Sequence, residues 1–182
     1  MNDEQLFNPI LDDDEKIQEI FRPNAFRYVG LPLIFLCTLL LLCIVPFTVM
    51  ALIEGDWLLM VPFFVPVFLI GILLAVIYCV QYKKTSYCYT NKRVIVRSGF
   101  IGVDYHAIDF DLIGGMDVHV DFLDKLVKPN TGTIVFASAA SPIVHTNQKI
   151  SAYSFKAIEN PYEIYKRVKA YSSKNKDGNF NS

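Results

Sequence analysis

The stretch YTNKRVIVRSGFIG, residues 89–102, changes the pattern of this chain. Its side chains alternate with a period of two, so that Val94 and Val96 share one face of a strand and Ile95 lies on the other. Asn91-Lys92 has the composition of a tight turn, so the stretch predicts a β-hairpin. It follows closely on the most apolar part of the chain, so β structure is expected to begin almost where that part ends.

Upstream, two long runs carry no charged residue: 29–53 and 57–81. A helix of about 20 apolar residues crosses a hydrocarbon core about 30 Å thick, so each run is long enough to span a bilayer. Only Glu54, Gly55 and Asp56 separate them, which predicts an antiparallel transmembrane hairpin over residues 29–82. Intramembrane ionisable residues mark ion and proton paths, and the two runs have none, so the hairpin is interpreted as an anchor.

The charges are distributed unevenly along the chain. Residues 1–28 hold seven acidic and three basic side chains, and residues 83–182 hold fourteen basic and nine acidic ones. Basic residues flank the hairpin and none lies in its turn, which predicts a multi-pass protein of the plasma (cytoplasmic) membrane with both termini in the cytoplasm. The overall formal charge of −1 gives no indication of a nucleic-acid partner.

Downstream, short alternating segments are followed by one helix. The clearest half-buried strand is 116–122, where Met116, Val118 and Phe122 alternate with polar residues. Asn160-Pro161 suits a helix start, and residues 173–182 form a polar tail. The sequence therefore divides into an acidic N-terminal segment (1–28), the hairpin (29–82), a mainly-β domain closed by one C-terminal helix (83–172), and the tail (173–182).

Three segments that follow the apolar runs carry a resemblance: YCYTNKRVIVRSGFIG, DFLDKLVKPNTGTIVF and FKAIENPYEIYKRV. Their order resembles the bacterial pleckstrin-homology-like (PH-like) domain family, in its membrane-hairpin branch. The matching positions are Tyr87, Thr90, Arg93, Gly99, Gly132-Thr133-Ile134 and Asn160-Pro161. The resemblance implies bent antiparallel sheets, or a split barrel, with a C-terminal helix, and it does not imply an enzyme. One departure is KPN at 128–130, which lengthens the turn before Gly132.

Five basic residues are the candidate membrane-surface or lipid contacts: Lys83, Lys84, Lys92, Arg93 and Arg97. Each Lys or Arg near an anionic leaflet adds about 1 kcal/mol of attraction. Phosphoinositide-binding members of the wider fold resemble one another in a long basic first loop. The turn at Asn91-Lys92, interpreted as that loop, is too short to wrap a headgroup, so only non-selective contact with anionic lipid is expected.

Three metal-capable side chains lie on one predicted strand face, Asp117, His119 and Asp121, with Asp104 and His106 spaced similarly upstream, so a metal site is geometrically possible if the strands are neighbours. The polar outer face of a half-solvated sheet explains them more simply. No C-x-x-C pair and no nucleophile motif appears in the sequence. No metal, no cofactor, no catalytic residue and no enzyme activity are therefore predicted.

The predicted function is that of a non-enzymatic integral membrane protein. Its PH-like domain is expected to contact a protein partner, or further copies of itself, at the inner leaflet. An anionic-lipid-sensing module is the alternative, and a metal-dependent activity on the face of Asp117, His119 and Asp121 is the remote one.

Overall fold

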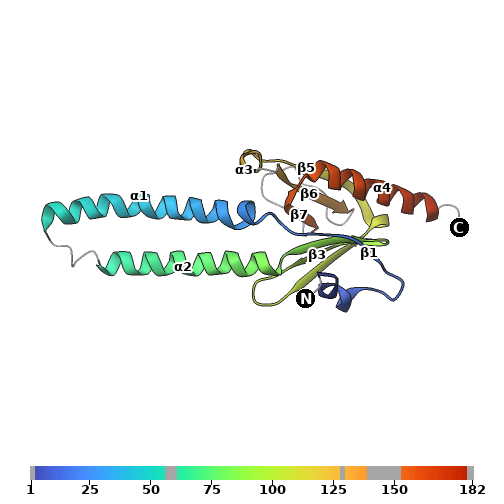
Figure 1. Ribbon diagram of the computed structural model, residues 1–182, viewed down its shortest axis with the longest axis horizontal. Helices are drawn as coiled ribbons and strands as arrows, with labels where there is room; N and C mark the ends of the chain where they lie inside the picture. The colour runs from blue at the N-terminus through green and yellow to red at the C-terminus, as the bar shows by residue number, and fades with distance from the viewer. Residues whose placement is uncertain (1–2, 56–60, 128–129, 139–152, 180–182) are drawn as a thin grey trace.

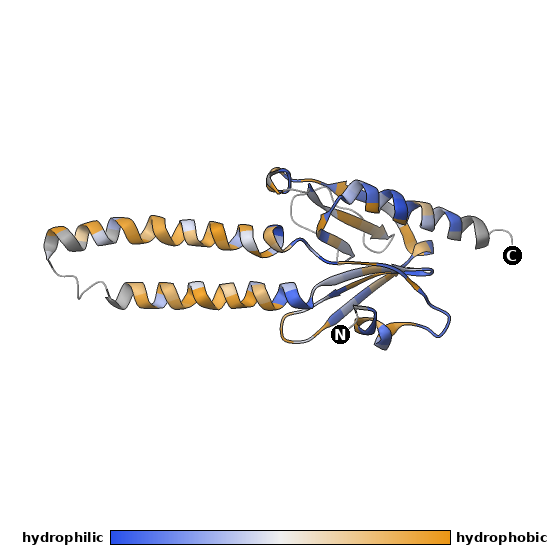
Figure 2. Ribbon diagram, viewed as in Figure 1, coloured by the Kyte–Doolittle hydropathy of each residue, from blue (hydrophilic) through white to orange (hydrophobic). Residues whose placement is uncertain are grey.

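The structure is a computed structural model that describes residues 3–55, 61–127, 130–138 and 153–179. A long helical hairpin projects from one end of a β domain, and α4 lies along one side of that domain (Figure 1). The chain therefore has two parts of unlike chemistry, and Figure 2 shows the apolar one to be the hairpin.

The hairpin consists of α1 (Leu31–Glu54) and α2 (Val61–Lys84), with a π-helical turn, Phe26–Gly30, leading into α1. Both helices are long and apolar enough to cross a membrane by length and composition. Gly71 lets the two helices approach, since a Cβ at this position would lie 3.0 Å from Leu40 Cδ1. Residues 56–60, which include Asp56 of the predicted turn and the start of the predicted second helix, lie outside the described residues.

The first sheet is antiparallel and has the strand order β1-β2-β3-β4. Its strands are β1 (Ile17–Phe21), β2 (Ser86–Thr90), β3 (Arg93–Ser98) and β4 (Asp104–Asp109). Ile17 pairs with Thr90 and Phe21 with Tyr87, so β1 lies beside β2 although the whole hairpin separates them in sequence. Residues 1–28, for which the sequence predicted no element, thus supply an edge strand of the domain.

The second sheet has the order β5-β6-β7, with β5 (Ile113–His119), β6 (Thr131–Ser138) and β7 (Ser154–Glu159). A 3₁₀ turn, η5 (Phe110–Leu112), connects the sheets, and α4 (Pro161–Asn179) packs over β5 and β6. The helix thus continues through most of the predicted polar tail.

The predicted strand 116–122 is wrong at its C-terminal end. β5 stops at His119, and Phe122 begins a short helix, α3 (Phe122–Leu126), with its side chain exposed. The Asp124 carboxylate accepts a hydrogen bond from the Asp121 N–H. This contact stabilises the first turn of the helix, so the chain does not continue as a strand.

The main core lies between the two sheets and under α4. Val94 and Val96 point into it, and the ring of Phe155 packs on Tyr87 and Phe136 with both pairs of centroids 5.0 Å apart. The opposite face of the first sheet is covered as well, because Phe7 packs fully buried against Cys88 and Ile95. The predicted alternation along 93–97 is therefore correct, and the N-terminal segment covers the face that would otherwise meet water.

Candidate functional site

The direction of the strands gives the β domain two distinct ends. β1 runs toward the hairpin and β2 runs away from it, so Phe21 and Tyr87 lie at one end and Ile17 and Thr90 at the other. We call these the hairpin end and the far end. Antiparallel pairing then places the β3–β4 loop at the hairpin end, and the Asn91-Lys92 turn and η5 at the far end. The contact of Arg27 with Asp124 places α3 at the hairpin end as well.

The five candidate basic residues do not form one surface. Lys83, Lys84 and Arg97 lie at the hairpin end, whereas Lys92 and Arg93 lie at the opposite end of the sheet, beyond Thr90. A strand rises about 3.3 Å per residue, so five-residue β2 separates the two groups by well over 10 Å.

At the far end, Arg93 binds the acidic N-terminal segment. Its Nε and Nη2 donate to the Glu15 carboxylate, at 3.0 Å to Oε1 and 2.6 Å to Oε2, and Nη2 also donates to the Ile10 carbonyl at 2.9 Å. The Glu15 side chain is fully buried. Burial by itself raises the pKa of Glu15, but the hydrogen bonds from Arg93 and Thr90 outweigh it and hold the pKa below its ordinary value.

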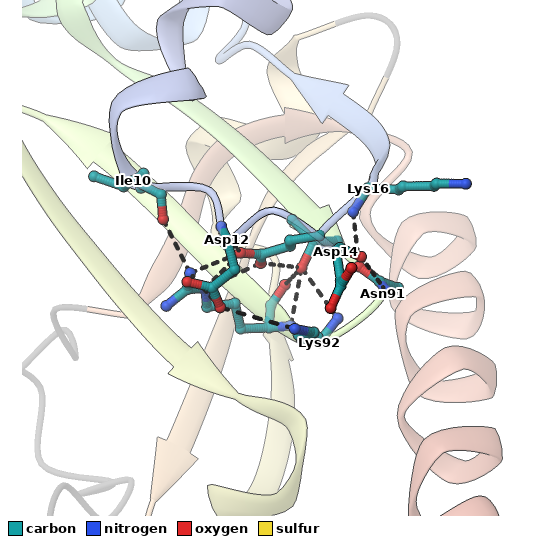
Figure 3. A network of polar contacts seen from close by, with 9 residues as sticks. Ile10, Asp12, Asp14, Lys16, Asn91 and Lys92 are labelled. Carbon is teal, nitrogen blue, oxygen red and sulfur yellow. Dashed lines mark hydrogen bonds and ion pairs between the residues drawn. The ribbon is translucent and has the colours of Figure 1, made fainter.

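The surrounding contacts complete this network, which Figure 3 shows from close by. Thr90 Oγ1 donates to Glu15 Oε1 at 2.6 Å and accepts from the N–H groups of Lys92 and Arg93. Asn91 Oδ1 accepts from the Lys16 N–H at 2.9 Å, and Asp12 lies 3.5 Å from the Arg93 guanidinium. Thr90 and Arg93, two positions of the quoted motif, thus attach the N-terminal segment to the β2–β3 turn.

The Asn91-Lys92 turn is not the first loop of the fold. It joins β2 to β3, because β1 precedes the hairpin in the sequence. The connection between the first two strands is the hairpin itself together with its short flanks. The sequence analysis interpreted this turn as a shortened first loop, and that interpretation was wrong. It was wrong because β1 had not been recognised as the first strand.

At the hairpin end, Lys84 holds the β3–β4 loop. Its Nζ donates to three successive carbonyls, of Phe100 at 2.7 Å, Ile101 at 2.9 Å and Gly102 at 3.3 Å. Arg97 Nη1 donates to the Lys84 carbonyl at 2.8 Å, which caps the C-terminus of α2. Gly99 has φ 151°, and a Cβ there would lie 2.5 Å from the Gly102 carbonyl oxygen, so this tight loop requires glycine.

A second cation at the other helix holds α3. Arg27, in the turn that leads into α1, donates through Nε to Asp124 of α3, and this carboxylate is buried and also accepts from Thr131 Oγ1 at 2.9 Å. Nearby, the rings of Tyr28 and Tyr82 pack with centroids 6.1 Å apart. Each helix of the hairpin is therefore joined to the domain by its own basic residue.

The residues weighed as metal ligands are divided between the sheets. Asp104 and His106 lie on β4, and Asp117 and His119 lie on β5 of the other sheet, where His119 pairs with Thr133. Asp121 precedes α3 and lies 3.8 Å from Arg27. Within the part of the chain that the structure describes, no group of three His, Cys, Asp or Glu residues has the arrangement of a metal site.

Comparisons with known proteins give one family. The model of the bacterial PH domain matches residues 28–171, which is most of the chain; among the strands that the structure describes, the match omits only β1. No curated protein matches. A crystal structure of a DUF1696-family protein with a pleckstrin-homology domain, from Shewanella loihica PV-4, is similar at 13% identity and a TM-score of 0.41, covering 92% of this chain and 91% of that one.

The matched region holds three strands of the first sheet, the whole second sheet and the larger part of the closing C-terminal helix, in agreement with the fold that the sequence resemblance implied. That resemblance is confirmed, and the chain belongs to the bacterial PH domain family.

Proposed function

We propose that this chain is a non-enzymatic integral membrane protein that presents its PH-like domain to a partner protein, or to further copies of itself, at the cytoplasmic face. The observation that carries the proposal is the exposed surface of the hairpin. Large apolar side chains such as Phe35 and Leu42 are 72% and 71% exposed, and almost nothing in the most apolar windows of either helix is buried. Contiguous apolar surface of this extent is rare on monomeric proteins in water and is the usual surface of helices in lipid.

The strand pairing supports the proposed topology. β1 enters the hairpin and β2 leaves it, and the two strands pair directly. A hairpin that crosses a bilayer twice must then have the N-terminal segment and the C-terminal domain on the same side. Arg22, Arg27, Lys83 and Lys84 flank the hairpin on that side, which favours the cytoplasm.

The proposed contact surface for a protein partner is the outer edge of β4. β4 pairs with β3 on one side, and no other strand among the described residues pairs with its other side. His106 and Ala107, near the middle of β4, are exposed. An exposed sheet edge accepts an added strand from another chain through its backbone groups. The β1 edge is less open, because Arg167 and Tyr171 of α4 contact Glu19 and Gln18.

Anionic-lipid sensing remains the second candidate. Lys83 and Lys84 lie at the helix end that would meet the headgroups, which favours it. Lys92 and Arg93 lie at the far end beside acidic side chains, which weakens it because charges already paired attract a leaflet less.

Two measurements test the proposal. For topology, Gly55→Cys and Ser173→Cys are made separately, in a chain whose native cysteines are replaced, and treated with an impermeant thiol reagent in intact cells. Labelling at 55 and protection at 173 are expected, and the reverse pattern contradicts the topology.

For the contact surface, a photo-crosslinking residue is placed at Ala107, with the exposed Ala170 of α4 as matched control. Equal cross-linking at both positions contradicts the assignment of the β4 edge.

A further inference from the structure

Two apolar tips project from the β domain at the hairpin end. One is the β3–β4 loop, in which Ile101 is 89% exposed and Phe100 and Val103 are also exposed. The other is the start of α3, in which Phe122 is 75% exposed and Leu123 is exposed as well. Figure 1 shows them on either side of the hairpin, close to the level at which α1 and α2 join the domain.

Both tips are held where they are by the hairpin. Lys84, the last residue of α2, donates to the Phe100, Ile101 and Gly102 carbonyls, and Arg27, just before α1, binds Asp124 of α3. The cations that would lie at the headgroup level therefore fix the heights of the two tips. The Tyr28–Tyr82 ring pair lies at the same end of the hairpin, where aromatic side chains concentrate at membrane interfaces.

We propose that these tips are a pair of interfacial anchors, which enter the cytoplasmic leaflet at the headgroup–acyl boundary on opposite sides of the hairpin and fix the orientation of the domain. The inference rests on the proposed membrane insertion of the hairpin. The occupant is the bilayer itself, because the two apolar tips flank the domain-side end of the hairpin, where Lys84 and Arg27 hold them at the level expected for the headgroups. Interfacial segments bury their apolar side chains about 5–10 Å into this boundary, a depth that a loop tip can reach.

Apolar contact of this kind does not depend on a particular headgroup. The two cations that position the tips are already bound, Lys84 Nζ to loop carbonyls and Arg27 to Asp124. The exposed Lys125 of α3 adds attraction to an anionic leaflet, but the apolar contact does not require it. The anchors therefore differ from the anionic-lipid contacts considered above, and they should act in zwitterionic bilayers as well.

The test uses tryptophan emission and quenching by lipids brominated on the acyl chain. The chain has a single tryptophan, Trp57. In a Trp57→Phe background of the full-length protein, Ile101→Trp and Phe122→Trp report the two tips. Leu112→Trp is the matched control, because Leu112 is 61% exposed but lies in η5 at the far end of the domain. Leu39→Trp, within α1, reports insertion of the hairpin.

Each variant is reconstituted in phosphatidylcholine vesicles with and without bromination. We expect the tryptophans at positions 39, 101 and 122 to emit at shorter wavelength than the one at position 112. We also expect their intensity to be lower in brominated than in unbrominated vesicles, while the intensity at position 112 is the same in both. If 101 and 122 behave like 112 while 39 is quenched, the anchors are refuted and the membrane hairpin stands. Quenching at only one tip refutes anchoring on both sides. If position 39 is not quenched either, the proposed membrane insertion fails and the anchors fail with it.

Discussion

Arg93 Nη2 lies 2.6 Å from Glu15 Oε2, across 78 residues of sequence that include the whole helical hairpin. The pair joins the acidic N-terminal segment to the β2–β3 turn, and the same segment carries Phe7 onto Cys88 and Ile95. Because the Glu15 side chain is fully buried, removing Arg93 leaves a carboxylate in the interior without its main partner, which is far more costly than losing a surface ion pair. Removing Glu15 leaves Arg93, which is 22% exposed and lies 3.5 Å from Asp12. The segment before the hairpin is therefore part of the folded domain.

We expect Glu15→Ala to release the N-terminal segment locally. Losing the charged hydrogen bonds of Glu15 costs about 2 kcal/mol, which is on the order of 30-fold in the opening equilibrium. Cys88 reports the opening, because it lies beneath Phe7 and burial raises the pKa of its thiol. With Cys37, Cys43 and Cys79 replaced by alanine, thiol labelling should be much faster in Glu15→Ala than in the parent. Asp13→Ala, an exposed change in the same segment, is the control, and equally fast labelling there would contradict the role of the pair.

The same carboxylate predicts a pH dependence. Its pKa is lower in the folded state than the ordinary value of 4.5, so ionised Glu15 stabilises docking above that value. This stabilisation is lost as the pH falls through the lower folded pKa. We expect the parent to protect residues 3–15 from hydrogen exchange better than Glu15→Gln at neutral pH, with the difference shrinking below pH 4.5. Exchange rates are corrected for the intrinsic effect of pH, and a difference that grew toward acid would show that the pKa is raised instead.

Gly132 predicts a packing effect at the hairpin end. A Cβ at this position would lie 2.8 Å from Pro161 Cγ and 3.0 Å from the His119 carbonyl oxygen. We expect Gly132→Ala to destabilise the domain by about 1–3 kcal/mol, because β6, β5 and the start of α4 must move apart. Gly114→Ala is the control, since nothing lies within 4 Å of its Cβ position, and it should change stability by less than about 0.5 kcal/mol. Thermal unfolding of the two full-length variants in detergent compares them, and similar melting would refute the close approach.

Local periodicity predicted much of the fold. Val94 and Val96 alternate with Ile95 within one strand, and the Asn160-Pro161 start lies beside its own helix, so the information for these elements is contained in a few neighbouring residues. β1 could not be recognised in this way. Ile17–Phe21 is short, and the strand it pairs with, Ser86–Thr90, begins only after the hairpin. Without β1, the Asn91-Lys92 turn was assigned to the wrong connection.

The candidate site was less predictable than the fold, for a physical reason. The sequence shows which residues are basic but not which acceptors they meet. Arg93 is bound to a carboxylate and Lys84 to backbone carbonyls, and both kinds of acceptor are brought close only by tertiary packing. The exposed positions of Ile101 and Phe122 likewise depend on where β3 and β5 end. A signal for the first tip was present in the sequence, since Phe100-Ile101 lies between two glycines, a composition typical of a turn.

Substitutions of Lys83 and Lys84 distinguish two possible roles of these lysines, holding the β3–β4 loop in position and attracting lipid headgroups. They are adjacent and carry the same charge, but Lys84 Nζ donates to three loop carbonyls while the side chain of Lys83 is exposed. Lys84→Gln removes the ammonium that donates hydrogen bonds to three carbonyls of the β3–β4 loop, so this loop should lose its fixed position. Hydrogen exchange of the full-length protein in phosphatidylcholine nanodiscs should therefore become faster at residues 99–103 in Lys84→Gln and remain unchanged in Lys83→Gln.

The two substitutions remove one positive charge each, so any effect of attraction to a leaflet must be nearly equal for both. Adding anionic lipid tests that attraction directly, since each Lys near a charged surface adds about 1 kcal/mol. If exchange at residues 99–103 responds equally to both substitutions, and only when anionic lipid is present, then Lys84 acts as a headgroup contact and the loop is not held by its carbonyls. A response to Lys84→Gln alone, in zwitterionic lipid, instead assigns Lys84 the role of fixing the loop beside α2, at the height where Ile101 would meet the bilayer.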